Sequence, residues 1–180
     1  MQKSNFFFTA DEHYNHPNIL KFMNRPWNNI TEMNLDLVRR NNEVVSKEDF
    51  VIHAGDFCWK GSAEFIKSLQ KSLIGQHIYL RGSHDNWMNG SHHEIWERTI
   101  DGQHIVVCHY AMRTWGKSHW NSWQLHGHSH GKLDSIGKQY DVGVDTNNFY
   151  PVSFDKIKEI MDKKEDNIGR IDTLFEKDIK

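Results

Sequence analysis

The chain has 180 residues, with 22 Lys plus Arg against 24 Asp plus Glu and a formal net charge of −2. This balance argues against a global basic surface of the kind that holds an extended nucleic-acid backbone. No apolar run approaches the roughly 20 residues that cross a bilayer, and the three phenylalanines at residues 6–8 are a shorter run than the apolar region of a signal peptide. We therefore expect a cytoplasmic protein without membrane association. The length predicts one domain over residues 1–180, with a helical tail from about residue 151.

Apolar runs alternate with amphipathic segments along the chain, a pattern typical of an α/β protein. Short apolar runs predict strands over residues 6–8, 50–54, 77–80, 105–108, 123–126 and 140–144. Apolar residues at helical spacing predict helices over residues 31–45, 62–75 and 154–164. Thr31 and Ser62 are the expected N-caps, and Gly75 is the expected stop. Beyond about residue 164 the charged end predicts a weakly packed tail. Cys58 and Cys108 lie in apolar contexts, which predicts two free, buried thiols.

The 13 histidines are spread along the chain and gather with carboxylates just after the predicted strands, often beside a glycine. Ligands in open α/β sheets bind at the C-terminal ends of the strands, so residues far apart in sequence are expected to converge there. Imidazole nitrogens and carboxylate oxygens suit manganese, iron, zinc, nickel or cobalt ions, and affinity alone does not choose among these metals. The pattern predicts a metal-dependent enzyme. The clusters are Asp11-Glu12-His13, Gly55-Asp56, Gly82-Ser83-His84-Asp85, Cys108-His109 and Gly127-His128-Ser129-His130.

The order of these clusters resembles the signature of the calcineurin-like metallophosphoesterases, which is Asp-x-His, Gly-Asp, Gly-Asn-His-Asp, His and Gly-His-x-His. The resemblance covers about residues 5 to 146. Within it, Asn18-Ile19-Leu20 and Arg25-Pro26 resemble the small single-domain bacterial and phage members of phosphodiesterase type. The resemblance implies a four-layer type of α/β (α+β) sandwich, in which helices flank two mixed β-sheets. A dinuclear metal centre would lie at the C-terminal edges of the strands.

The resemblance also implies a role for each residue of the clusters. Two cations about 3.5 to 4 Å apart would neutralise a phosphodiester and generate the hydroxide that attacks it. His84 would be the catalytic residue, stabilising the transition state or protonating the leaving oxygen. Asp56 would bridge the two ions. One ion would be held by Asp11, His13, Asp56 and His130, and the other by Asp56, Ser83, His109 and His128.

Two features depart from the family pattern. Ser83 stands where the pattern has Asn, and a serine hydroxyl is a poorer metal ligand than an amide carbonyl. The second metal site is therefore expected to be weaker or completed by water, and activity to be attenuated. Residues 57–61 lack the further Asp and the Arg-Gly that the protein phosphatases of this superfamily carry. This disfavours a phosphoprotein substrate.

Four further residues are candidates for substrate binding. His16 and His126 lie near the expected site in sequence. For both, the sequence favours neither a role in lining the substrate cleft nor a purely structural role. Residues 112–123 mix cations with aromatic rings. Arg113 and Trp115 in this loop would pair with a phosphate and stack on a base. The alternative is that the loop tryptophans only pack against the core.

These observations favour a metal-dependent phosphodiesterase acting on nucleotides or other small phosphodiesters. The enzyme alternatives are a nuclease, for which the near-neutral charge is unfavourable, and a mononucleotide or dinucleoside-polyphosphate hydrolase. A different class of function is a catalytically weak binding or scaffold protein that retains the fold, and Ser83 is its main support. The sequence leaves the true substrate, the identity of the metals and the oligomeric state open.

Overall fold

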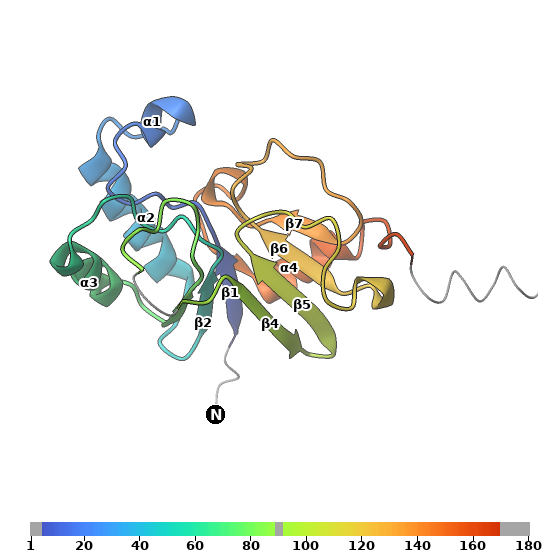
Figure 1. The fold of residues 1–180 in the computed structure, drawn as a ribbon. Coiled ribbons are helices and arrows are strands. Elements are labelled where there is room, and N and C mark those ends of the chain that lie inside the picture. The colour runs from blue at the N-terminus through green and yellow to red at the C-terminus, as the bar shows by residue number, and fades with distance from the viewer. Residues whose placement is uncertain (1–4, 89–91, 170–180) are drawn as a thin grey trace, which may run out of the picture.

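The computed structural model describes residues 5–88 and 92–169, which form two four-stranded mixed sheets (Figure 1). In the first sheet, β1, β2 and β3 are parallel, and β8 is antiparallel to β1. Parallel pairing places the C-terminal ends of β1, β2 and β3 at one edge. The strand order of this sheet is β3 (Gln76–Tyr79), β2 (Phe50–His53), β1 (Phe6–Thr9) and β8 (Val152–Ser153).

The second sheet is also mixed. Its strands β5, β6 and β7 are parallel, and β4 is antiparallel to β5. The strand order is β4 (Ile95–Ile100), β5 (Gln103–Cys108), β6 (Trp123–His126) and β7 (Gln139–Asp141). The expected architecture of two mixed sheets flanked by helices is confirmed.

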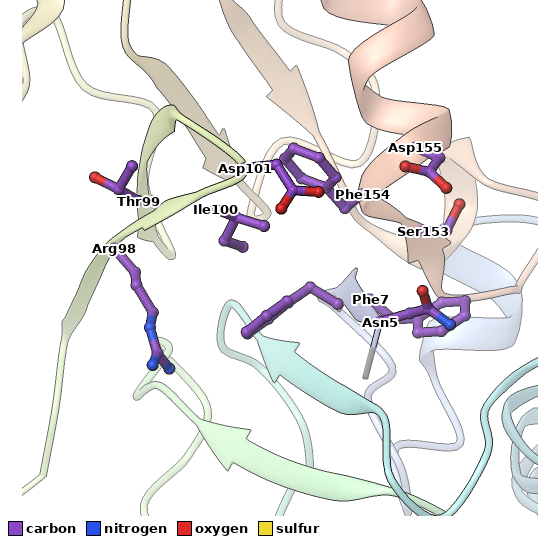
Figure 2. Close-up of a pocket in the computed structure, with 10 residues that line it drawn as sticks. Asn5, Phe7, Arg98, Thr99, Ile100, Asp101, Ser153, Phe154 and Asp155 are labelled. Atoms are coloured by element: carbon purple, nitrogen blue, oxygen red, sulfur yellow. The ribbon is translucent and has the colours of Figure 1, made fainter. Parts of the chain in front are cut away.

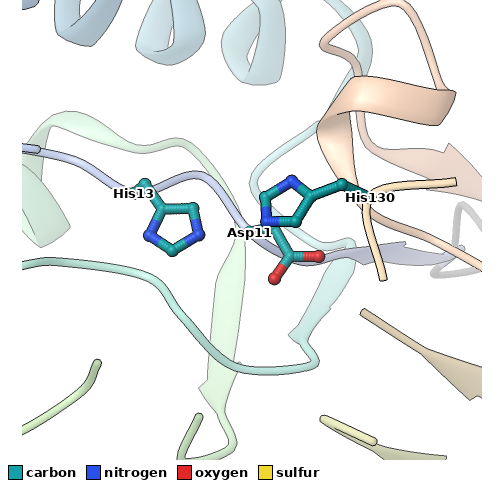
Figure 3. A group of neighbouring side chains, drawn as sticks. All are labelled: Asp11, His13 and His130. Atoms are coloured by element: carbon teal, nitrogen blue, oxygen red, sulfur yellow. The ribbon is translucent and has the colours of Figure 1, made fainter. Parts of the chain in front are cut away.

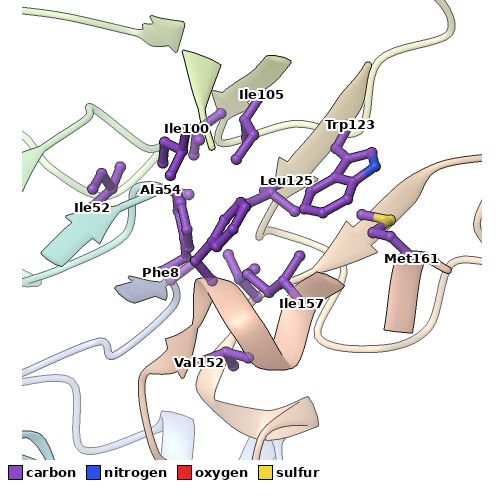
Figure 4. Packing of buried hydrophobic residues seen from close by; sticks show 14 of the residues in the cluster. Phe8, Ile52, Ala54, Ile100, Ile105, Trp123, Leu125, Val152, Ile157 and Met161 are labelled. Carbon is purple, nitrogen blue, oxygen red and sulfur yellow. The ribbon is translucent and has the colours of Figure 1, made fainter. Parts of the chain in front are cut away.

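One hydrophobic cluster joins the two sheets (Figure 4). Phe8 and Ile52 enter it from the first sheet, and Ile105 and Leu125 enter it from the second. Helix α4 (Phe154–Met161) adds Phe154, Ile157 and Met161 to the same cluster. Burying this apolar surface fixes the two sheets relative to each other, and therefore also the loops that leave their strand ends.

Three helices accompany the first sheet: α1 (Ile19–Phe22), α2 (Ile30–Val44) and α3 (Ala63–Ser72). A second cluster packs Met33 and Leu37 of α2 with Ile66 and Leu69 of α3. Ser62 caps α3 as predicted, since its hydroxyl accepts from the Phe65 N–H. The prediction of Thr31 as the cap of α2 was wrong.

The cap of α2 is Asn29, whose side-chain oxygen accepts from the Glu32 N–H at 2.9 Å. Helix α4 is shorter than predicted and ends at Met161. After it, Lys138 donates from Nζ to the carbonyl oxygens of Met161 and Lys164, at 2.8 and 2.7 Å. These bonds tie β7 and its preceding turn to the C-terminal end of α4 and to the turn that follows it.

Part of the segment after α4 is held firmly. Asn167 is buried, and its Nδ2 donates to the carbonyl oxygens of Ser118 and Ser122 at 3.0 and 2.8 Å. As far as Asn167, the segment is therefore packed more firmly than predicted. The end of the predicted tail, residues 170–180, lies outside the described residues. Both cysteines are free and buried, as predicted. Within residues 5–88 and 92–169, no helix is long and apolar enough to cross a membrane.

Candidate metal centre

The loops that follow five strands bring the predicted metal ligands to one place. β1, β2 and β3 supply residues from the first sheet, and β5 and β6 supply residues from the second. The structure thus gathers at one edge side chains that are more than a hundred positions apart in the sequence. The predicted ligands, all within the described residues, are Asp11, His13, Asp56, Ser83, His109, His128 and His130.

The first group consists of Asp11, His13 and His130, whose ligand atoms all lie within 4.8 Å of one another (Figure 3). Asp11 is fully buried, and only 2% of His13 is exposed. Neither ring nitrogen of His13 has a hydrogen-bond partner among the described residues. A buried imidazole without partners is costly, which a bound cation would relieve. Burial lowers the pKa of His13 to about 3, so the ring is neutral and its lone pair is available.

Asp11 is held as a carboxylate ligand would be. Its oxygens accept from the His128 backbone N–H at 2.9 and 3.1 Å. Burial, helped by the nearby acids, raises the pKa of Asp11 well above its usual range. A divalent cation at this position would reverse that effect, because it favours the ionised carboxylate.

The second group consists of Asp56, His109 and His128, and its ligand atoms also lie within 4.8 Å of one another. The Nδ1 of His109 lies 2.9 Å from the Ala54 carbonyl oxygen and donates to it. This fixes the tautomer and leaves the lone pair on Nε2, which is buried and has no partner in the described part of the chain. A backbone carbonyl behind a metal-binding histidine is a common arrangement in proteins.

Asp56 lies between the two groups. Its Oδ2 is 3.7 Å from His13 Nε2 in the first group and 3.4 Å from His109 Nε2 in the second. Burial by itself would raise the pKa of this carboxyl, but His109 and the His84 backbone N–H outweigh burial and lower it. Asp56 is therefore ionised and within reach of both groups, as a bridging ligand must be.

Ser83 and His84 follow β3 and face Asp56. The Ser83 hydroxyl lies 3.1 Å from Asp56 Oδ2, and the His84 backbone N–H donates to Asp56 Oδ1 at 2.8 Å. The His84 imidazole is turned outward, with 43% of the side chain exposed and Nε2 3.9 Å from Asp56 Oδ2. The His84 imidazole thus combines solvent access with closeness to Asp56; His128 is exposed as well, but it belongs to the second ligand group.

Five of the seven predicted ligands have a left-handed backbone, which side chains other than glycine seldom adopt. The φ angles are 59° for Asp11, 53° for His13, 58° for Asp56, 68° for His128 and 47° for His130. Aspartate and histidine tolerate this region better than most residues, but it still carries strain. The concentration of strained positions at one edge is typical of a functional site.

Two glycines of the sequence clusters are explained by close approach. A Cβ on Gly82 would lie 2.3 Å from both the backbone nitrogen and the Oδ1 of Asp56. A Cβ on Gly127 would lie 2.6 Å from Asp11 Oδ2. Both distances are shorter than real Cβ contacts allow, so any larger residue would displace a predicted ligand.

Behind His130 lies a pair of residues whose role the sequence analysis missed. Asp145 Oδ2 is 2.6 Å from His130 Nδ1, and Arg25 holds both oxygens of Asp145 through Nε and Nη2. The same guanidinium donates to the carbonyl oxygens of Asp11 and Glu12. Arg25 belongs to the Arg25-Pro26 pair that resembles the small family members, but nothing in the sequence indicates its contact with Asp145. Asp145 carried no local signal, because it is 120 residues from Arg25 in the sequence.

Two other carboxylates anchor the loops that carry the ligands. Asp85 accepts from the backbone N–H groups of Asp56, Gly82 and Cys58. Asp141 accepts from the Gly131 and Gly143 N–H groups and from the Ser129 hydroxyl. These bonds satisfy buried backbone groups in loops that follow β2, β3, β6 and β7.

Of the predicted substrate-binding residues, His16 lies beside the ligands. Its ring centroid is 5.5 Å from that of His13 and 6.0 Å from that of His84, and it stacks on Trp59 at 4.3 Å. His126 is buried at the end of β6, with Nδ1 2.9 Å from the Gly127 carbonyl oxygen.

The loop that carries the other two candidates packs on itself. The Trp115 indole N–H donates to the Ser122 carbonyl oxygen at 3.1 Å. Arg113 is exposed. These contacts favour the structural alternative for Trp115.

A pocket of about 470 Å³ opens at the opposite end of β1, where the strand begins (Figure 2). Asn5, Phe7, Arg98, Asp101 and Phe154 are among its lining residues. None of its lining residues is a predicted ligand, so this pocket is separate from the metal-binding groups.

Comparison with known proteins identifies a family. The chain is 30% identical to the uncharacterized protein MJ1445 of Methanocaldococcus jannaschii over 171 residues, which are 91% of this chain and 94% of that protein. This chain belongs to the MJ1445 family. No family model matches it.

The fold of this MJ1445-family chain is similar to those of solved structures. A protein of unknown function from Aquifex aeolicus, AQ665, superposes with a TM-score of 0.67 at 19% identity, over 88% of this chain and 100% of that one. This likeness shows a shared fold. A predicted phosphoesterase from Streptococcus pneumoniae is more distant, with a TM-score of 0.42 and 15% identity over 79% of this chain and 72% of that one.

Proposed function

We propose that this MJ1445-family chain is a metal-dependent phosphoesterase that hydrolyses nucleotides or other small phosphodiesters. The observation that carries the proposal is the position of the Asp56 carboxylate between two groups of ligand atoms. Structural zinc sites are usually closed by four protein ligands around one ion. Two adjoining groups that share a carboxylate are instead the arrangement used for catalysis on phosphate esters.

The residues fit two divalent cations. The first would be held by Asp11, His13, Asp56 and His130, and the second by Asp56, Ser83, His109 and His128. When bound, such ions supply positive charge for the phosphate oxygens and activate water near neutral pH. Manganese, iron, zinc, nickel and cobalt all suit these ligands.

The remaining chemistry belongs to side chains around the ligands. His84 is exposed and close to Asp56, so its imidazole is placed to donate a proton to the leaving oxygen or to stabilise charge on the phosphate. His16 lies beside His84 and is placed to contact the substrate. The formal net charge of −2 favours small substrates over extended nucleic acid.

The test is hydrolysis of bis(4-nitrophenyl) phosphate and of the 4-nitrophenyl monoester, with manganese, nickel, zinc or a chelator. We expect diesterase activity that requires metal and that falls at least about a hundredfold in Asp56→Asn, because this one change weakens the binding of both ions. Asp36→Asn is the matched control, since that carboxylate pairs with Arg39 and Arg40 on α2. Activity that survives the chelator or Asp56→Asn would rule the proposal out.

A binding or scaffold function is the second candidate, and the observation that favours it is Ser83. Its short hydroxyl is engaged with Asp56 and is a weak ligand for a second ion. The two functions differ in stoichiometry and turnover. Two ions per chain with turnover support the enzyme, whereas one ion or none without turnover supports the scaffold.

A further inference from the structure

A second pocket, of about 320 Å³, opens directly beside the second ligand group. Ser83 and His109 form the wall toward the metal-binding residues. The rest of the lining includes Arg81, Glu94, Ile95 and Tyr110. Its volume is at the lower end of the range for small-molecule sites, about 300 to 1,000 Å³. A substrate whose phosphate lies at the metal-binding residues therefore has room here for one of its substituents.

Two large side chains of the pocket are about half exposed. Ile95 is 49% exposed and Tyr110 is 48% exposed, so both present apolar surface to the pocket. Ile95 pairs with Cys108 in the β4–β5 register, which places it at the strand end that leads into His109. The Tyr110 ring lies 4.8 Å from the ring of His109 and 4.8 Å from that of His128, measured between centroids.

The backbone that carries Tyr110 is held by buried polar groups. Gln124 donates from Nε2 to the Tyr110 carbonyl oxygen at 3.2 Å, and it accepts from Gln139 Nε2 at 2.9 Å. Gln139 also donates to the Met112 carbonyl oxygen at 2.6 Å. Both glutamine side chains are buried. The aromatic wall of the pocket is therefore built into the fold, as a site with fixed geometry requires.

The charged side chains of the pocket have opposite signs. Arg81 supplies hydrogen-bond donors and Glu94 supplies acceptors. The two flank His92, whose Nε2 lies 3.1 Å from Arg81 Nη1 and 3.3 Å from Glu94 Oε1. A carboxylate in the lining disfavours a second phosphate group. A donor and an acceptor beside an aromatic face instead match a neutral, planar group that carries both kinds of hydrogen-bonding atom.

We infer that this pocket binds the base of a nucleoside phosphodiester, with the base against Tyr110 and Ile95 and its polar edge toward Arg81 and Glu94. Aromatic side chains stack on every base, and arginine and carboxylate side chains read base edges. The inference rests on the proposed function and deepens it, because it names nucleotides among the small phosphodiesters. It also makes Arg81 and Tyr110 specificity-determining residues.

The test compares two substrates that share a leaving group. Guanosine 5′-(4-nitrophenyl phosphate) and methyl 4-nitrophenyl phosphate both release 4-nitrophenolate, and they differ in the presence of the nucleoside. We expect kcat/KM to be at least about tenfold higher for the guanosine ester, as one good base contact would give. Arg81→Gln and, separately, Tyr110→Leu should reduce the ratio of the two kcat/KM values by about tenfold.

Arg98→Gln is the matched control, because Arg98 lies at the pocket at the opposite end of β1 and should leave the ratio unchanged. Equal kcat/KM values for the two esters in the unmodified protein would overturn the inference. So would a ratio that stays the same in both pocket variants, since the residues would then act on the metals or on folding alone.

A binding measurement separates this inference from the proposed function. Guanosine is titrated into the chelator-treated protein and followed by saturation-transfer NMR, which requires neither metal nor turnover. If neither ester is hydrolysed, the proposed function fails. Guanosine binding that is lost in Arg81→Gln and kept in Arg98→Gln would then still support the pocket, and no binding would overturn it.

Discussion

His130 and Asp145 are joined by a hydrogen bond in which Nδ1 lies 2.6 Å from Oδ2. Because Nδ1 is engaged by this bond, Nε2 is the ring nitrogen that would be free to bind a metal ion. Arg25 and His130 together lower the pKa of Asp145 to about 2 against the effect of burial, so this carboxyl is ionised. A carboxylate that hydrogen-bonds to a metal-binding histidine raises the basicity of that histidine and fixes the orientation of its ring.

Replacing Asp145 with Asn should weaken metal binding in the first group. The neutral amide would no longer hold Arg25 through two charged bonds or support the His130 ring. We expect the first metal to bind about 10 to 100-fold more weakly. Competition with a chromophoric chelator measures this affinity, with Asp36→Asn as the control. Unchanged affinity in Asp145→Asn would show that the His130 orientation does not depend on this bond.

Ser83→Asn should strengthen the second metal site. The longer amide reaches further than the hydroxyl, which lies 3.1 Å from Asp56 Oδ2, and its carbonyl is a better ligand. We expect the stoichiometry to approach two ions per chain and diesterase activity to rise several-fold. Isothermal titration with manganese and the initial rate on bis(4-nitrophenyl) phosphate test the two effects. A variant that gains neither metal nor activity would assign Ser83 a role outside the metal shell.

Gly82→Ala should disturb the bridging carboxylate and destabilise the fold. The added Cβ would lie 2.3 Å from backbone and side-chain atoms of Asp56, which are held by several bonds. We expect a loss of about 1 to 3 kcal/mol in the free energy of unfolding and a large loss of activity. Gly116→Ala is the matched control, because the atoms nearest to its Cβ would be the far end of the Glu97 side chain, which can move. Urea unfolding curves of both variants decide the comparison.

A pH effect on stability should come from His77, which is not one of the predicted metal ligands. Burial, with the neighbouring His53, lowers the pKa of His77 to about 4 from its ordinary 6.5. The unfolded chain therefore binds more protons between these values, so stability is highest above pH 6.5 and falls as the pH drops toward 4. His77 accounts for about 1 to 2 kcal/mol of this fall, since its ring is only partly buried.

The His77 contribution is isolated by a difference measurement. The stability of His77→Gln should depend less on pH than that of the unmodified protein between pH 6.5 and 4. Below pH 4 the two stabilities should change with pH at the same rate. Thermal unfolding in chelator from pH 4 to pH 8 provides the comparison. Parallel curves for the two proteins would place the pH dependence elsewhere.

The sequence predicted the structure best where the same short segment indicates both a strand and a functional residue at its end. Strands such as Phe50–His53 are short apolar runs that end at a glycine or a polar cluster, so both the strand and the site at its end could be predicted. The convergence of residues from separate strand ends followed from sheet geometry alone. The two groups that contain His13 and His109 are arranged as that geometry requires.

Other features depend on contacts that no local pattern records. Strand β4 was not predicted, because Glu97 and Arg98 interrupt its apolar pattern at an exposed position in the sheet. The pairing of Arg25 with Asp145 joins residues 120 positions apart. The Trp115 side chain was a candidate for stacking on a base, and its N–H instead bonds within its own loop. Composition cannot distinguish these two roles.

The candidate metal centre draws its residues from both halves of the chain, and this has a consequence for folding. The bond from the His128 N–H to Asp11 spans 117 residues, so the ligand groups cannot form before the two sheets have docked. Contacts of such long sequence separation are slow to form. Metal uptake would therefore report the end of folding, and a metal titration during refolding would time the docking of the sheets. In the finished protein, the same ions would act as a clamp between two halves that also meet through side-chain packing and through hydrogen bonds such as that from the His128 N–H to Asp11.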